Sequence, residues 1–156
     1  MEGFQSLLLW ASSLGSLLIS GVFFAFSSFI MSALARLPEG EGAAAMNAIN
    51  ITVINPLFMA VFLGTGLICA ALAAMNFSSL PEPAAIKIIA AAAVYVIGSI
   101  GVTMIFNVPL NNALAAAPTE SAALWADYLK TWTLWNSVRG LASLTAGALL
   151  ISALAC

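Results

Sequence analysis

The chain has 156 residues, of which 63% are hydrophobic and only 6% are charged, and its mean hydropathy is +1.09. Soluble domains carry about 25% charged residues, so this composition excludes a soluble globular protein and predicts an integral membrane protein. Six acidic and four basic residues give a formal charge of -2, which is too small and too scattered to indicate nucleic acid as a partner. The length fits one domain, residues 1–156.

Four stretches are long and apolar enough to cross a bilayer, whose hydrocarbon core of about 30 Å needs roughly 20 residues of helix. They lie at about residues 5–34, 56–75, 85–106 and 132–155. The first apolar run is too long for a signal peptide, so we interpret it as a retained helix. An even number of spans places both termini on one side of the membrane.

Prolines and caps set the expected ends of these helices. Asn55 is a predicted N-cap before Pro56, because proline fits the first helical turn and keeps its predecessor out of the helix. The third span is predicted to end where Pro109 breaks the helix. Thr119 is predicted to cap another helix, which runs to about Ala155 and would be about 50 Å long.

The two long connections, residues 36–55 and 107–131, are predicted to lie on the side opposite the termini. Residues 43–54 fit a short interfacial helix in the first connection, and a helix starts within the second. The predicted fold class is therefore all-α: an integral membrane four-helix bundle with short interfacial helices in the two long connections. Nearly all the amide side chains gather on this side, namely Asn47, Asn50, Asn55, Asn107, Asn111, Asn112 and Asn136.

The stretch WADYLKTWTLWNSVR at residues 125–139 carries the candidate site. Five of its side chains recur at steps of three and four, so on a helix they form one stripe, with Asn136 beside it. The stripe consists of Trp125, Tyr128, Trp132, Trp135 and Arg139. Aromatic rings, an amide and a fixed positive charge therefore share one helical face.

Arg139 has two interpretations. The helix that follows it to Ala155 is about 24 Å long, shorter than a hydrocarbon core of about 30 Å, so Arg139 should lie near the membrane boundary. It could be an anchor whose guanidinium snorkels to the interface beside interfacial tryptophans. Alternatively, the guanidinium turns inward toward Asn107 and Asn111 and binds an anionic or carbonyl oxygen in a pocket lined by neutral amides.

The chain has no histidine, which is the commonest general base and the commonest metal ligand. Its two cysteines, Cys69 and Cys156, have no zinc-like or redox spacing. We therefore expect no metal and no cofactor. Asp127 and Glu120 are the only carboxylates near the stripe, and Asp127 lies about 100° away from Tyr128 around the helix, so no general base can be named.

Three segments carry a resemblance to a known family: MNAIN and NPLF at 46–58, NVPLNNAL at 107–114, and the stretch at 125–139. In order and spacing they resemble the bacterial branch of the anthrone oxygenase family, which are small four-span membrane proteins. The likeness runs over nearly the whole chain. It implies a multi-pass protein of the cell membrane, the bacterial inner membrane, and the reaction of the fungal polyketide members, in which molecular oxygen converts an anthrone to an anthraquinone without a cofactor.

The resemblance also implies roles for the polar and aromatic residues. Arg139, Asn136 and Asn107 would be the catalytic residues, because they could stabilise the enolate oxygen of an anthrone as an oxyanion hole does. Aromatic residues would stack on a flat polycycle, and the amides would close the rim of the pocket. The expected substrate-binding residues are Tyr128, Trp132, Trp135, Asn111, Asn47, Asn50 and Asn55.

Two functions remain open from the sequence. The first is a cofactor-independent monooxygenase that acts on a flat lipophilic aromatic or quinone-like molecule. The second is a non-catalytic membrane protein that binds a lipid, a quinone or a partner subunit through the same pocket. The expected partners are membrane lipids and a small lipophilic ligand, and both a homo-oligomer and a partner subunit stay open.

Overall fold

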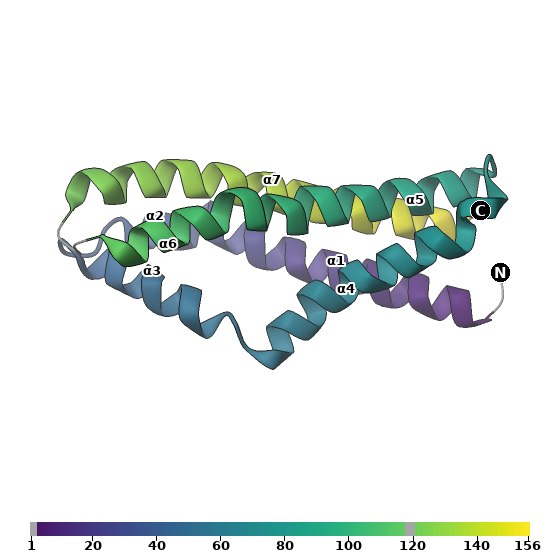
Figure 1. Ribbon diagram of the computed structural model, residues 1–156, viewed down its shortest axis with the longest axis horizontal. Helices are drawn as coiled ribbons and strands as arrows, with labels where there is room; N and C mark the ends of the chain where they lie inside the picture. The colour runs from purple at the N-terminus through teal and green to yellow at the C-terminus, as the bar shows by residue number, and fades with distance from the viewer. Residues whose placement is uncertain (1–2, 118–120) are drawn as a thin grey trace.

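A computed structural model describes residues 3–117 and 121–156 of the chain. Within these ranges the protein is almost entirely helical and contains no strand, which confirms the all-α prediction. Figure 1 shows an elongated bundle whose long helices run side by side, with both termini at one end. The turn between α2 and α3 lies at the opposite end (Figure 1).

Four helical segments are long and apolar enough to cross a membrane, judged by length and composition. The segments are Gly3–Leu34, Pro56–Ser79, Pro83–Ala116 and Ala122–Leu154. Each contains or overlaps one of the four stretches predicted from hydropathy. The second, of 24 residues, is close to the roughly 20 residues that a hydrocarbon core requires, whereas the first, third and fourth have 32, 34 and 33 residues and are longer than one crossing needs.

π-helical turns interrupt the first and third segments, and the second segment ends in a 3-10 turn. The fourth segment is one continuous helix, α7 (Ala122–Leu154). The first segment comprises α1 (Gly3–Ala25), the π-helical turn η1 (Phe26–Ile30) and α2 (Met31–Leu34). The second comprises α4 (Pro56–Asn76) and the 3-10 turn η2 (Phe77–Ser79). The third comprises α5 (Pro83–Tyr95), the π-helical turns η3 (Val96–Gly101) and η4 (Thr103–Asn107), and α6 (Val108–Ala116).

The first connection contains the predicted interfacial helix, α3 (Glu41–Thr52). The next helix, α4, starts only partway along the bundle, so α3 and α4 together form a V beside the longer helices (Figure 1). Asn55 has an extended backbone at this vertex, and its side-chain oxygen accepts a hydrogen bond of 3.0 Å from the Phe58 amide. This confirms Asn55 as the N-cap and Pro56 as the first-turn proline.

The prediction that Pro109 ends the third span was wrong, because α6 continues the helix to Ala116. Pro109 lies in the first turn of α6, directly after the π-helical turn η4. Proline lacks an N–H group and crowds the carbonyl four residues earlier, and the wider π-helical turn accommodates this ring without ending the helix.

The second connection therefore has no separate helix before residue 117. Thr119, the predicted cap of the last helix, lies outside the described residues.

The packing of the bundle places α7 against α1 and against the third segment. Ser20 of α1 donates a hydrogen bond of 3.0 Å to the carbonyl of Gly140 in α7, and Ser143 of α7 donates one of 3.0 Å to the Ser99 hydroxyl. A Cβ atom at Gly147 would lie only 3.0 Å from the side chain of Leu17. These close approaches fix α7 between two neighbours, and α7 carries the stripe.

One prediction tests the approach of α3 to its neighbours. A Cβ atom at Gly42 would collide with the Leu34 carbonyl and with the Trp125 ring. Gly42→Ala should lower the free energy of unfolding by about 1–3 kcal/mol, as overpacking does. Gly21→Ala is the matched control, because a Cβ atom there meets nothing within 4 Å. Unfolding in detergent is the measurement, and equal stability of the two variants would contradict the packing described.

Candidate functional site

A cavity of about 310 Å³ lies where α3 and α4 diverge from the other helices. Known ligand pockets measure roughly 300–1,000 Å³, so this one is large enough for a small molecule. Apolar and aromatic side chains form most of its wall, and no carboxylate lines it within the described chain. Its polar lining residues are Asn50, Thr103, Asn111 and Arg139.

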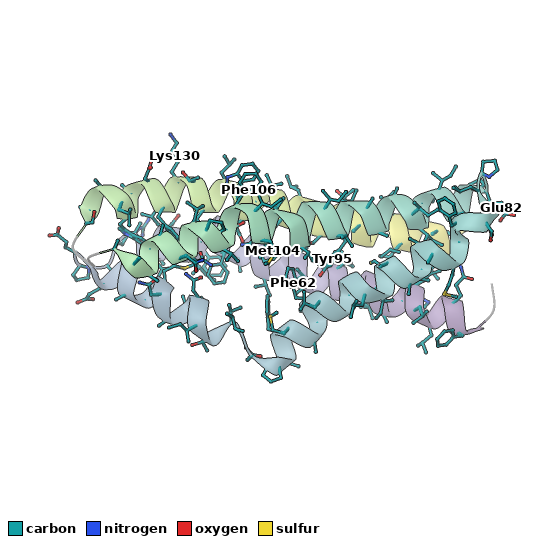
Figure 2. The ribbon with its side chains drawn as sticks, in the orientation of Figure 1. Phe62, Glu82, Tyr95, Met104, Phe106 and Lys130 are labelled. Carbon is teal, nitrogen blue, oxygen red and sulfur yellow. The ribbon has the colours of Figure 1, made fainter. Side chains whose placement is uncertain are left out.

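The cavity opens toward the side of the bundle. Met104 lines it and is 62% exposed, and Leu63 of α4 lines it and is 40% exposed. In Figure 2 the side chains of Met104 and Phe62 point toward each other from the third segment and from α4. Both helices belong to segments that are apolar enough to cross a membrane, so the mouth opens between two such helices.

Arg139 reaches the cavity wall from the middle of α7 and is only 6% exposed. Its Nη1 atom donates to the Thr103 hydroxyl at 3.1 Å, and its Nη2 atom donates to Asn136 Oδ1 at 2.8 Å. The guanidinium carbon lies 4.2 Å from the centroid of the Phe23 ring and 5.3 Å from that of Trp132. The guanidinium is therefore enclosed by the bundle rather than extended along its surface.

The charge of Arg139 has neutral partners in the described chain. An amide oxygen, a hydroxyl and two aromatic faces offset part of the cost of burying a cation. The Nε atom is buried and has no hydrogen-bond partner among the described residues. Of the five N–H donors of an arginine, Nη1 and Nη2 each use one on Thr103 and Asn136. Each keeps a second N–H group, and the net positive charge remains for an oxygen atom placed in the cavity.

Asn136 positions the guanidinium of Arg139 from the side away from the cavity. It is fully buried, and its Nδ2 atom donates to the Phe23 carbonyl and to the Ser27 hydroxyl, each at 2.7 Å. The opposite atom of the same amide, Oδ1, accepts from Arg139. Asn136 does not line the cavity, so it acts through Arg139.

A second hydrogen-bonded group surrounds the edge of the Trp132 indole. Asn111 Oδ1 accepts one hydrogen bond from the Tyr128 hydroxyl and one from Trp132 Nε1, each of 2.8 Å. Asn50 Nδ2 donates to the same hydroxyl at 3.4 Å. Four residues expected at the site thus meet around one ring, although they come from α3, α6 and α7.

The remaining expected site residues lie apart from the cavity lining. Trp135 stacks on Phe106, with ring centroids 3.6 Å apart and an angle of 8° between the planes. Asn107 is fully buried, donates to the Trp132 carbonyl at 3.3 Å, and has no partner for its oxygen among the described residues. Asn47 is half-buried on α3, and Asn55 is exposed as the cap of α4.

Several cavity residues were not singled out from the sequence. Thr103, which holds Arg139, is one of them, and its hydroxyl also donates to the Ser99 carbonyl at 2.8 Å. The spacing of Phe58 and Phe62 on one helical face was the available signal for the aromatic wall, because residues four apart are neighbours. The other missed lining residues include Phe23, Phe26, Met46, Met59 and Met104.

Comparison with known proteins gives one match. The family model described as Anthrone oxygenase matches residues 58–149. This range contains most of α4, the whole third segment and most of α7, and it includes Thr103, Asn111, Trp132 and Arg139. Neither a curated protein nor a solved structure matches the chain.

The two fully buried asparagines of this region should differ in their effect on stability. Asn136→Leu leaves a buried arginine N–H without its acceptor and removes the hydrogen bonds to the Phe23 carbonyl and the Ser27 hydroxyl, so it should lower the free energy of unfolding by about 3 kcal/mol. Asn107→Leu removes a long hydrogen bond and an oxygen without a partner, so its effect should stay within about 1 kcal/mol. Unfolding in detergent measures both, and an equal loss in the two variants would contradict these contacts.

Proposed function

The chain belongs to the anthrone oxygenase family, and from this premise we propose that it is a cofactor-independent membrane oxygenase with a pocket for a flat lipophilic aromatic or quinone-like molecule. The observation that carries the proposal is the buried guanidinium of Arg139 at the wall of an apolar cavity, where Nη1 and Nη2 each use one N–H group on a neutral partner and keep a second one. From the resemblance to the bacterial branch, we propose the bacterial inner membrane as its location.

The aromatic walls support binding of a flat ring system. Phe58 and Phe62 are nearly parallel, with centroids 5.8 Å apart and an angle of 22° between the planes. Phe23 packs edge-on against Phe62 at 6.3 Å. Offset and edge-to-face arrangements of this kind accept a further aromatic ring. The sideways mouth would admit such a lipophile from the hydrocarbon phase, where it partitions.

The chemistry needs little from the protein beyond charge stabilisation. An anthrone has an acidic ring CH2 group, and loss of one proton gives an enolate that can transfer an electron to dioxygen directly. Overall, the CH2 group and O2 become a carbonyl group and water. Arg139 would stabilise the negative oxygen of the enolate, as the donors of an oxyanion hole do, and Asn136 and Thr103 would hold the guanidinium in place.

A second candidate function rests on the composition of the cavity wall. None of the described lining residues is an aspartate, a glutamate or a histidine, so the wall offers no ordinary general base. This favours a non-catalytic protein that binds a quinone, a lipid or a partner subunit through the same cavity. In the oxygenase, by contrast, the proton of the CH2 group would pass to water.

The binding proposal predicts a specific effect of the charge at Arg139. Arg139→Lys replaces a planar fork of donors by a point charge, and Arg139→Leu removes the charge. Losing a charged hydrogen bond costs about 1.5–3 kcal/mol, so each variant should bind anthraquinone roughly one to two decades more weakly. Quenching of tryptophan fluorescence by the bound ligand is the measurement.

Arg36→Leu is the matched control, because Arg36 is exposed and lies outside the cavity lining. It should bind anthraquinone as the native chain does. Equal affinity in all four proteins would make Arg139 a structural residue and would refute the proposed site.

Isotopically labelled dioxygen separates the oxygenase from the binding protein. The purified chain, treated with a metal chelator, should convert anthrone to anthraquinone faster than buffer and detergent alone, with labelled oxygen in the new carbonyl. Arg139→Leu should reduce this rate at least tenfold if one charged hydrogen bond is lost in the transition state. If the chain binds anthraquinone but does not accelerate the oxidation of anthrone, the non-catalytic function is supported and the oxygenase is refuted.

A further inference from the structure

We propose that Asn50 and Asn111 form a second polar subsite, which selects a ligand carrying a hydroxyl group at the end of its ring system remote from the oxygen at Arg139. The inference rests on the proposed cavity and extends it, because it specifies what the other end of the ligand must be. Both asparagines line the cavity, and neither touches Arg139 through any hydrogen bond in the described chain.

The orientation of the Asn111 amide follows from its partners. Trp132 Nε1 is only a donor, so the atom of Asn111 that lies 2.8 Å from it must be the carbonyl oxygen. The Tyr128 hydroxyl donates to the same oxygen, which occupies both of its lone pairs. The amide nitrogen must then point away from both rings, and within the described chain it has no protein partner and is not enclosed. Asn111 therefore offers N–H donors to the cavity.

Asn50 offers the complementary atom. The Tyr128 hydroxyl donates its one O–H group to Asn111. It can therefore only accept a hydrogen bond from Asn50, whose Nδ2 lies 3.4 Å away. The Asn50 carbonyl oxygen is left without a partner among the described residues and is not enclosed. One subsite thus presents a donor from Asn111 and an acceptor from Asn50. A hydroxyl group, which both donates and accepts, matches this pair.

The subsite and Arg139 contact different parts of the Trp132 indole. The guanidinium carbon of Arg139 lies 5.3 Å from the Trp132 ring, whereas the Nε1 edge of the indole is bonded to Asn111. The guanidinium therefore lies over the ring and the asparagine pair lies at its Nε1 edge, so one fused aromatic ligand beside Trp132 would contact both polar groups. Arg139 supplies donors only and fits a carbonyl or enolate oxygen, and the asparagine pair fits a hydroxyl.

A matched pair of probes tests the subsite: anthraquinone and 2-hydroxyanthraquinone, titrated into the full chain in detergent at a pH below the pKa of the phenol. The native protein should bind the hydroxylated probe roughly fivefold more tightly, the effect of one neutral hydrogen bond. Asn50→Leu and Asn111→Leu should abolish this preference while anthraquinone itself still binds. Asn112→Leu is the control and should keep it, because Asn112 is exposed and outside the lining.

The outcomes separate the subsite from the proposed function. Equal affinity of the native chain for both probes, with binding that still depends on Arg139, would overturn the subsite alone. A preference that survives Asn50→Leu would overturn it too, and this variant decides the question even if Asn111→Leu fails to fold. Failure of both probes to bind would overturn the cavity as a site for aromatic ligands and the subsite with it.

Discussion

The buried positive charge of Arg139 is the constraint on which the rest of this structure depends. A cation inside an apolar bundle is costly unless its donors are satisfied, and the bundle satisfies it with neutral groups from three directions. Thr103 comes from the third segment, Asn136 from α7 itself and the Phe23 ring from α1. A carboxylate would have neutralised the guanidinium. Neutral partners orient it and leave its charge available to the cavity.

The cavity exists because the helices beside Arg139 are irregular. The V formed by α3 and α4 leaves space that a straight second span would fill, and Asn55 with Pro56 fixes its vertex. The π-helical turns lie at the same level: η1 supplies Ser27, which holds Asn136, and η4 begins at Thr103. Such turns are rare and occur frequently at functional sites, so their position here agrees with the proposed site.

Local signals in the sequence were sufficient to predict the helices. They were insufficient to predict the irregular turns within the helices and the contacts between them. Hydropathy gave the four segments and Asn55-Pro56 gave a helix start, because both depend on neighbouring residues. Pro109 misled the prediction because the π-helical turn that accommodates it has no signature in the sequence. Within the site, the spacing of Trp132 and Arg139 places them about 20° apart around the helix, but Trp135 lies about 60° from Trp132, and it faces Phe106. The contact of Asn136 with Ser27 joins residues 109 positions apart, which no local pattern reveals.

The geometry of Arg139 also bears on the choice between an anchor and a site. An anchoring arginine extends its flexible stem until the charge reaches water or headgroups, and such a side chain needs no partner inside the bundle. Arg139 instead bonds inward to Thr103 and Asn136, and Asn136 is itself fixed by two further hydrogen bonds. A chain of oriented groups holds one guanidinium at the wall of an apolar cavity. Stability alone does not account for this arrangement, because hydrophobic residues of similar volume often stabilise a core as well as buried charges do. The ligand oxygen proposed above would account for it.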